Sequence, residues 1–430
     1  MRDKIQRPRL LRQFLPNAKN KRLVIITGAR QTGKTTLARD FYSDLKYINL
    51  DSPENRESVR LVPASNWARD IGNAVIDEAQ KEPVVFDKLK YAYDDNKVAF
   101  SVLLGSSQIL LLKKIRESLA GRVSIYELWP LLMSEIYEGN KASKAKPPLV
   151  DRLFSKDSLK HILNSVPGVL MGQPDSLCRT AEEYLMRWGG MPALLPLAED
   201  ERWKWLKDYE YTYLERDLAD LARLDDLEPF RKFQKLTALR SGKLLNYSEI
   251  ARDAGISVDT ARRYLEYLKV SYQTILIQPY YKNITSSVVK TPKVYWLDIG
   301  LLRQLSGYRG ELSGEIYETM VVAELFKWVK TAQRDAEIFF YRTRSGLEVD
   351  ILLKTSGGII GMEIKSRKKI AAGDARALKE VAKGIKNDWR GGMIIYQGNE
   401  IKKFAEPNIW AVPSRRLFTP VEMANSNRGN

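Results

Sequence analysis

Short hydrophobic runs alternate with amphipathic stretches of helical spacing between residues 23 and 135. This alternation is typical of βαβ units, in which helices cover a parallel sheet. The clearest strand candidates are residues 23–26, 74–76 and 102–104, because each is an uninterrupted apolar run, as expected for a strand buried on both faces. We therefore expect an α/β domain over residues 1–137.

After residue 137, the composition and the predicted secondary structure change several times along the chain. Residues 139–148 are small and polar and end in prolines, which is typical of a linker or an exposed insertion. Residues 180–240 have helical spacing, 244–310 pass from two short helices into β-rich sequence, and 311–405 suggest helix, hairpin, helix and strand. We expect an α/β multidomain chain with these parts after the first domain: 138–240, a linker or insertion and a helical domain; 241–310, a helix-turn-helix; and 311–430, a C-terminal α/β domain.

A glycine-rich run joins the first strand candidate to an amphipathic helix. Its residues fit the phosphate-binding pattern G-x-x-x-x-G-K-[ST] at every specified position: Gly28, Ala29, Arg30, Gln31, Thr32, Gly33, Lys34 and Thr35. Such glycines let backbone N–H groups turn toward phosphates, and the positive end of the helix adds to the attraction. Lys34 is expected to reach the β- and γ-phosphates of ATP, Thr35 to bind Mg²⁺, and Thr36 to complete the nucleotide contacts.

Other strand candidates end in residues that suit the same site. The second strand is followed by Asp77, expected to hold Mg²⁺ through water, and by Glu78, expected to orient the attacking water. The third leads to Ser106, a candidate contact for the water or the γ-phosphate, with an ordinary turn as the alternative. Arg122 is the nearest candidate for an arginine finger, although an exposed arginine commonly has no such role.

Residues 244–268 have the spacing of a helix-turn-helix. The first helix is expected to start at Ser248 and the second after Ser257, with these two serines as the N-cap residues. Arg262 and Arg263 would lie on the outer face of the second helix, where they could meet phosphates or base edges. Because acidic residues are interspersed, docking within the protein is an equal alternative.

A β-hairpin is predicted around the turn at residues 355–358. A symmetric loop would place Asp350 opposite Glu363 and Glu348 opposite Lys365, with apolar residues on the other face. Opposed carboxylates repel, so Asp350 and Glu363 would need a cation between them, and Lys365 could steady a hydroxide or a phosphate. A solvated charged face is the alternative.

Composition limits the chemistry and the partners. His161 and Cys178 are the only residues of their types, so a Cys/His zinc site and an intrachain disulfide are excluded. The formal net charge of +17 favours nucleic acid, with DNA preferred, as a partner, and a solubilising surface is the alternative. The positive charge gathers at the two ends: residues 1–22 carry eight basic side chains against one acid, and residues 365–403 carry eleven against four. Since no apolar run approaches the roughly 18 residues of a membrane helix and the N-terminus has no signal core, we expect a cytoplasmic protein without a membrane partner.

These motifs together resemble prokaryotic AAA-superfamily ATPases that carry a C-terminal domain of unknown function with nuclease-like features. Beyond the phosphate-binding run, the resemblance rests on residues 189–192 (GGMP), 213–218 (YLERDL), 246–251 (NYSEIA) and 292–300 (PKVYWLDIG). It spans nearly the whole chain except about residues 139–178. It implies a RecA/AAA-like P-loop domain with a parallel sheet, a helical lid, a winged helix-turn-helix and a restriction-endonuclease-like C-terminal domain.

Within the hairpin, the pattern D…ExK is similar to the PD-(D/E)xK nuclease core. The resemblance implies that Asp350 and Glu363 bind metal and that Lys365 is catalytic. A preceding helix usually supplies a further carboxylate, for which Glu318 is the candidate. Val349 stands where such sites usually have proline. Basic residues that would suit a phosphate backbone follow downstream: Lys368 and Lys369.

The sequence therefore favours an ATP-hydrolysing P-loop ATPase, using ATP and Mg²⁺, coupled to DNA binding or processing, with a candidate metal-dependent nuclease domain. The alternative is a nucleotide-controlled switch that binds protein or nucleic acid and cleaves nothing. A metabolite kinase is less attractive, because the extra basic domains would then have no evident use. The oligomeric state stays open, including a homo-oligomer in which Arg122 acts on a neighbouring copy.

Overall fold

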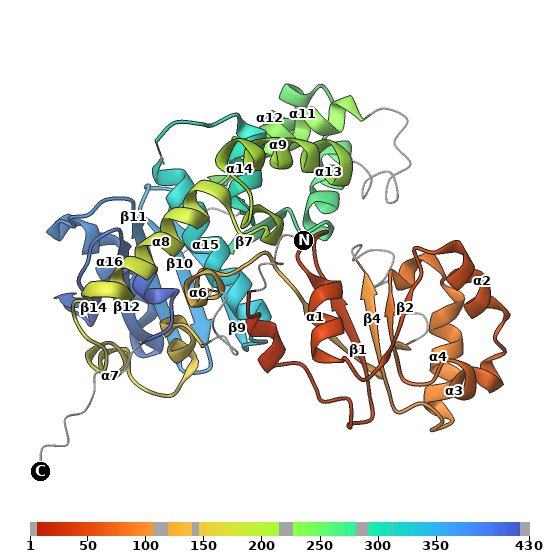
Figure 1. Ribbon diagram of the computed structural model, residues 1–430. Helices are drawn as coiled ribbons and strands as arrows, with labels where there is room; N and C mark the ends of the chain where they lie inside the picture. Colours follow the sequence, from red (N-terminus) through yellow and green to blue (C-terminus); the bar gives the residue numbers. More distant parts are fainter. Residues whose placement is uncertain are drawn as a thin grey trace, which may run out of the picture.

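The computed structural model describes residues 7–105, 119–139, 146–214, 227–280, 291–311 and 313–421. Figure 1 shows an N-terminal sheet domain in red and orange, a group of green helices, and a C-terminal sheet domain in blue. Within the described ranges, no helix combines the length and the apolar character needed to cross a bilayer.

The N-terminal domain is built on a parallel sheet of five strands in the order β2-β3-β4-β1-β5. The three strands predicted from their apolar runs are confirmed, as β1, β3 and β4. The strand bounds are β1 Arg22–Thr27, β2 Lys46–Asn49, β3 Ala74–Asp77, β4 Phe100–Gly105 and β5 Val123–Glu127. The helix bounds are α1 Lys34–Phe41, α2 Pro53–Leu61, α3 Trp67–Asp70 and α4 Val84–Asp94.

Helices cover both faces of this sheet. Leu37 and Ala38 of α1 pack with one set of strand side chains, whereas Val59 of α2, Trp67 of α3 and Phe86 of α4 pack with the other. The strands are buried on both sides, which explains why they appear in the sequence as uninterrupted apolar runs.

The middle of the chain is mainly helical. The helix bounds are α6 Met133–Glu138, α7 Leu159–Asn164, α8 Gly172–Trp188, α9 Glu199–Tyr209, α11 Glu228–Ala238 and α14 Ile299–Ser306. Residues 215–226 of the predicted helical region lie outside the described residues.

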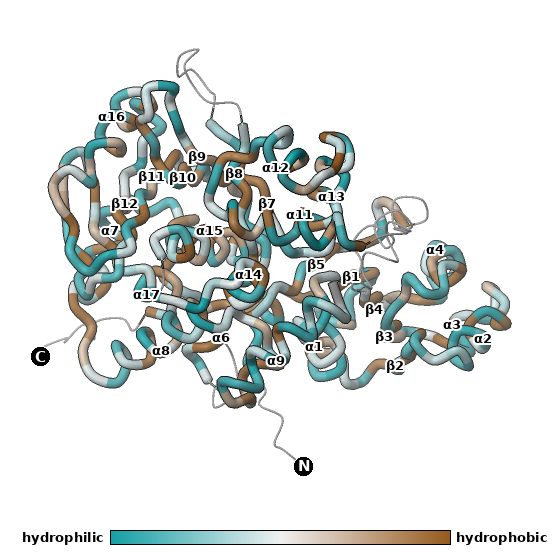
Figure 2. The backbone as a smooth tube through the Cα atoms, turned by 90° about the horizontal axis from the view of Figure 1, so that it is seen from above, coloured by the Kyte–Doolittle hydropathy of each residue, from teal (hydrophilic) through white to brown (hydrophobic). Residues whose placement is uncertain are grey.

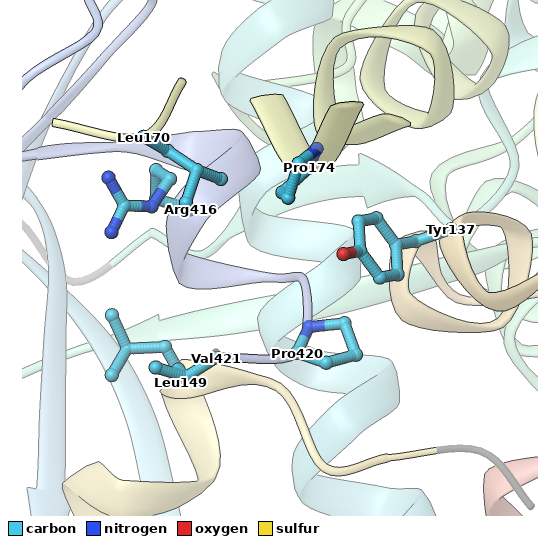
Figure 3. Close-up of a pocket in the computed structure, with 7 residues that line it drawn as sticks. All are labelled: Tyr137, Leu149, Leu170, Pro174, Arg416, Pro420 and Val421. Carbon is cyan, nitrogen blue, oxygen red and sulfur yellow. The ribbon is translucent and has the colours of Figure 1, made fainter. Parts of the chain in front are cut away.

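The part of the expected insertion that the structure describes, residues 146–178, packs against the end of the chain. Pro148 forms an isolated β-bridge with Pro420, and Val169 forms one with Glu400. Figure 3 shows a pocket where this segment meets α6, α8 and the short helix α17 (Ser414–Leu417). Its lining residues are Tyr137, Leu149, Leu170, Pro174, Arg416, Pro420 and Val421. This segment is thus a packed part of the C-terminal half.

Two helices lie where the helix-turn-helix was predicted, α12 (Tyr247–Ala254) and α13 (Val258–Val270), with Gly255 in a left-handed conformation between them. The name helix-turn-helix is kept for this pair. Ser257 caps α13, as expected. The predicted cap of α12 was wrong, because Asn246 occupies that position and its side chain accepts the N–H groups of Ser248 and Glu249. An asparagine two residues upstream satisfies the free helix donors as well as serine does.

The C-terminal half is organised by one mixed sheet of nine strands in the order β13-β14-β12-β11-β10-β9-β7-β8-β6. The strands beside the helix-turn-helix are β6 Lys243–Leu244, β7 Thr274–Pro279 and β8 Lys293–Trp296. The others are β9 Ala336–Arg342, β10 Glu348–Thr355, β11 Gly358–Lys365, β12 Trp389–Tyr396, β13 Lys402–Ala405 and β14 Ile409–Pro413. Gln278 and Pro279 of β7 pair in parallel with Phe339 and Phe340 of β9. The sheet therefore runs across the boundary expected between residues 310 and 311.

Two helices cover this sheet from opposite sides. Helix α15 (Gly314–Thr331) packs with Ile351, Ile360 and Met362, whereas α16 (Arg376–Ile385) packs with Leu352 and Ile359. Figure 2 shows brown, hydrophobic stretches along the strands between these helices. The hairpin of β10 and β11 is thus a core element of the fold. The alternative prediction, a solvated charged face, can apply only to the residues at its open end.

Candidate nucleotide-binding site and carboxylate cluster

The glycine-rich loop connects β1 to α1, as the sequence predicts. Gly28, Gln31 and Gly33 have φ angles of 151°, 60° and 94°, so the loop needs backbone conformations that favour glycine. The Lys34 Nζ atom lies inside the turn, 2.9 Å from the carbonyl oxygen of Gly28 and 2.8 Å from that of Ala29. The loop is therefore wrapped around a buried cation at the positive end of a helix.

The two residues expected to hold magnesium lie in contact. The Thr35 hydroxyl donates a 2.7 Å hydrogen bond to Oδ2 of Asp77, at the end of β3. Tyr47 of β2 donates to the same oxygen at 2.7 Å, a contact that the sequence analysis missed. Burial and then the neighbouring Asp77 carboxylate raise the pKa of Tyr47, so its hydroxyl stays a donor. This contact could have been predicted only by knowing that β2 pairs with β3, because the two residues lie 30 positions apart in the sequence.

Glu78 stands directly after β3 in a left-handed conformation, with φ 54°. A non-glycine residue in this region carries strain that is typical of functional positions. Gln80 Nε2 donates to Oε2 of Glu78 at 2.5 Å, which holds the carboxylate beside the end of the strand. This position agrees with the water-orienting role expected of Glu78.

Two other predicted site residues are not placed with this group. Ser106 lies outside the described residues. Arg122 precedes β5 at the edge of the sheet opposite the phosphate-binding loop, because Val123 pairs with Leu23 at the start of β1. Its guanidinium binds Asp94 through two bonds of 2.6 and 2.9 Å. Arg122 therefore does not lie beside the phosphate-binding loop of its own chain, and its role as an arginine finger stays a prediction.

Arg9 reaches the phosphate-binding loop from the N-terminal segment. It donates 2.6 Å hydrogen bonds to the carbonyl oxygens of Thr32 and Trp129, and its Nε donates to Glu135 at 3.1 Å. Both side chains are buried, at 10% exposure for Arg9 and 1% for Glu135. Arg9 was counted among the basic residues that attract polyanions, and the structure corrects this, because a buried and paired guanidinium is not available to a partner.

The turn after α13 touches the end of β1. Tyr272 has a φ of 62° and its hydroxyl lies 3.1 Å from Oγ1 of Thr27, the residue before the loop. Its ring also packs edge-on against Trp129, at 5.0 Å between centroids. The helix-turn-helix is therefore in direct contact with the strand that carries the nucleotide loop.

A second group of charged side chains gathers around Lys293 of β8. Its Nζ lies 3.1 Å from Glu318, 2.5 Å from Glu348 and 4.0 Å from Asp350. Tyr295 also donates to Glu318 at 2.7 Å. Burial lowers the pKa of Lys293, but the attraction of the three carboxylates outweighs burial and raises it, so the ammonium stays charged.

The hairpin register explains how Asp350 joins this group. The predicted register is confirmed from Ile351 opposite Met362 to the end of the hairpin. Between Val349 and Leu352, however, β10 contains a bulge relative to β9. Val349 and Leu352 consequently face the α16 side, and Asp350 turns toward Glu318 of α15.

The expected direct opposition of Asp350 and Glu363 is therefore corrected. Asp350 Oδ2 accepts the backbone N–H of Ile364 at 2.8 Å, just beyond the last paired residues. Burial, and then the charges of Glu318 and Glu363, raise the pKa of Asp350 well above its usual value. The two hairpin carboxylates are thus electrostatic neighbours, although they are not a directly opposed pair.

Glu363 and Lys365 lie at the rim of the same group. Lys365 Nζ donates to Oε1 of Glu363 at 2.6 Å, while Oε2 of Glu363 is buried without a hydrogen-bond partner. An unpaired carboxylate oxygen in this position suits a cation. Yet nowhere in the described residues are three carboxylate, histidine or cysteine side chains grouped closely enough to hold a metal ion. The carboxylates instead surround an ammonium.

The four predicted nucleic-acid contacts are exposed: Arg262, Arg263, Lys368 and Lys369. Arg262 lies over the ring of Tyr247, 5.5 Å from its centroid, and 3.9 Å from Asp259. The two lysines lie on the loop that follows β11. All four can meet a partner, although Arg262 also has neighbours in its own chain.

Comparison with protein families matches three parts of the chain. Residues 20–137 match the AAA domain family. Residues 179–312 match a domain of unknown function (DUF8612), and residues 313–417 match another (DUF4143). The N-terminal part is therefore an AAA-superfamily P-loop ATPase domain, which is a nucleotide-binding domain.

Two mycobacterial proteins are similar to most of the chain. Uncharacterized proteins of Mycobacterium bovis and Mycobacterium tuberculosis are each 28% identical over 352 residues, which cover 80% of this chain and 70% of the relative. Among solved structures, the Walker-type ATPase PABY2304 of Pyrococcus abyssi matches with a TM-score of 0.39 and 16% identity, covering 70% of this chain and 98% of that one. The Orc1 protein of Aeropyrum pernix, solved in complex with DNA, matches with a TM-score of 0.29 and 13% identity, covering 67% and 87%.

The Arg9 contacts generate a stability prediction. Arg9→Ala should lower the free energy of unfolding by about 3–5 kcal/mol, because it leaves the buried Glu135 carboxylate without its positively charged partner. Denaturant unfolding of the full chain measures this change. The control is Arg12→Ala, which removes an exposed ion pair with Asp40 and should cost about 1 kcal/mol or less. Equal effects of the two substitutions would contradict the buried role of Arg9.

Proposed function

We propose that this protein is an ATP-hydrolysing P-loop ATPase that couples nucleotide turnover to nucleic-acid binding, with DNA as the favoured form. The contact between Thr35 and Asp77, beside the Lys34 ammonium, carries the proposal. It gathers a phosphate-binding cation and two oxygen ligands of the kind that Mg²⁺ prefers at one edge of the sheet. Mg²⁺, when bound with ATP, would neutralise charge on the β- and γ-phosphates.

The residues of the nucleotide site have different roles in hydrolysis. Lys34 and the backbone N–H groups of the loop hold the phosphates, while Thr35 and Asp77 supply the ligands for Mg²⁺. Glu78 orients the attacking water through its carboxylate, which Gln80 steadies by its hydrogen bond. The Tyr209 hydroxyl, which donates to the Arg30 carbonyl oxygen at 3.1 Å, supports a lid role for the helical part.

Coupling to nucleic acid is supported by the position of the helix-turn-helix. The order α11, β6, α12, α13, β7, β8 supports the proposal of a winged helix, in which the second helix of the motif would present its outer side chains to DNA. Arg262 and Arg263 lie on that outer side, and the contact of Tyr272 with Thr27 links the unit to the nucleotide loop. The alternative is a switch in which the same link controls docking of a protein.

The first experiment separates nucleotide binding from hydrolysis. Lys34→Ala should abolish ATP binding, because the phosphates lose the cation of the loop, whereas Glu78→Gln should bind ATP and lose turnover by about 100-fold. Equilibrium nucleotide binding and phosphate release measure the two quantities. Lys46→Ala, at the opposite end of β2, serves as the control and should change neither. Hydrolysis at the wild-type rate by Glu78→Gln would refute the role of Glu78.

The second experiment concerns nucleic acid. Affinity for a mixed-sequence DNA duplex should fall steeply with salt, because bound phosphates release counterions. Arg262→Ala/Arg263→Ala should weaken binding and lower the slope of log affinity against log salt by about 2, one for each lost phosphate contact. Fluorescence anisotropy over a salt series measures the slope.

The control for this experiment is Arg69→Ala/Lys97→Ala, which removes the same charge from exposed positions of the N-terminal domain. It should leave the slope unchanged. If both double variants behave alike, the helix-turn-helix does not contact the phosphates and the docking alternative is preferred.

Metal-dependent cleavage by the C-terminal domain is the second candidate function. The observation that favours it is the convergence of Glu318, Glu348 and Asp350 on one cation, with Glu363 beside them. Carboxylates brought together in this way suit a divalent ion that activates water near a phosphate, and Lys365 would steady the developing charge. The ammonium of Lys293 at the centre of the group is the observation against it.

Cleavage is tested with DNA and RNA substrates in the presence of Mg²⁺ or Mn²⁺. Asp350→Ala and Lys365→Ala should each remove cleavage while ATP hydrolysis stays largely intact, because the nucleotide loop lies in another domain. Lys354→Ala, which alters an exposed lysine of the same hairpin, is the control and should cleave normally. The absence of cleavage by the wild-type protein on every substrate would leave the switch as the function of this domain.

A further inference from the structure

We infer that Lys293 and a divalent cation compete for one place in the carboxylate cluster, so that strand β8 holds the proposed cleavage site closed to metal. The inference takes its location from the second candidate function. It does not depend on cleavage activity, because it concerns which cation the carboxylates bind. That binding can be measured without a nucleic-acid substrate.

The first step is that Lys293 occupies the position a metal ion would need. Its ammonium lies among Glu318, Glu348 and Asp350, and its side chain is only 4% exposed. These carboxylates come from the helix α15 and the strand β10, which are two separate elements of the C-terminal domain. Lys293 is thus the common partner that brings them together.

The second step is that the two cations exclude one another. Oxygen ligands bind Mg²⁺ at about 2.0–2.1 Å and must point at a single ion. A buried ammonium 2.5 to 4.0 Å from the same carboxylates repels a second cation strongly, because charges a few ångströms apart interact with little screening. This agrees with the absence of any metal-ready group of three ligands in the described residues.

The third step is that Lys293 cannot leave by a simple movement of its backbone. It pairs with Ile277 of β7 on one side of the strand and with Leu244 of β6 on the other. Those strands belong to the unit that contains the helix-turn-helix. Release of the ammonium therefore requires either rotation of the buried side chain or a shift of that unit against α15 and β10. The release of Lys293 from the carboxylates is therefore linked to the unit that we propose as the nucleic-acid contact.

The cluster also contains the features expected of a site that is closed but chemically complete. Arg342 binds the second oxygen of Glu348 at 3.1 Å, and Lys365 binds Glu363. The remaining oxygen of Glu363 is buried without a partner. A buried carboxylate oxygen without a partner is costly, and a bound cation would satisfy it.

The test measures Mn²⁺ binding to the full chain in the absence of nucleotide, by titration calorimetry. The wild-type protein should show no saturable binding below about 1 mM that depends on Asp350. Lys293→Met removes the ammonium and keeps the length of the side chain, and should raise the affinity of the cluster for Mn²⁺ by about tenfold or more. Lys293→Met/Asp350→Asn should lose the gain. Lys354→Met, an exposed lysine of β10, is the matched control and should match the wild type.

An unchanged Mn²⁺ affinity in Lys293→Met would overturn the inference, as would tight binding by the wild-type protein that Asp350→Asn abolishes. The second comparison uses only the wild type and a substitution that keeps the shape of the carboxylate, so it can overturn the inference even where Lys293→Met does not fold. If Lys293→Met gains Mn²⁺ but cleaves nothing, the competition is established and the proposed cleavage function is rejected.

Discussion

The close contact between the phosphate-binding loop and the segment after β5 is the constraint on which the arrangement of the domains depends. A Cβ atom on Gly28 would lie 2.1 Å from the carbonyl oxygen of Leu128, so only glycine fits where the loop begins. Leu128 in turn donates its N–H to Thr27 at 2.8 Å. Because the two backbones touch without an intervening side chain, the loop and this segment must move together.

The segment that follows Leu128 is also where the other parts of the chain attach. The Trp129 ring packs against Tyr272 of the helix-turn-helix, and the Met133 N–H donates to Glu324 of α15 at 2.8 Å. A change in the loop on nucleotide binding therefore has a short path to both C-terminal units. Those two units share one sheet through the pairing of β7 with β9, so a change in one of them reaches the other.

Local patterns were enough to predict the elements whose chemistry is contained in a short stretch of sequence. The loop around Lys34, the strand ending at Asp77 and the register from Ile351 to Thr355 all follow from spacing, strand periodicity and turn composition. The failures involve contacts between distant segments. The paired Arg9 and the bulge at Asp350 depend on partners more than a hundred residues away or on an extra residue in a strand, and neither leaves a periodic signal.

Lys293 shows the same limit in its sharpest form, because the sequence segment that contains it looks like an ordinary buried strand. The partners of its ammonium become apparent only when the fold places α15 and β10 around it. Burying one ammonium with three carboxylates is a poor way to gain stability, since desolvation offsets much of the Coulombic attraction and apolar side chains would pack as well. A group of charges kept at such a cost, at the junction of two units, is better explained by a requirement for charge itself. The competition that we propose between Lys293 and a divalent cation would meet that requirement.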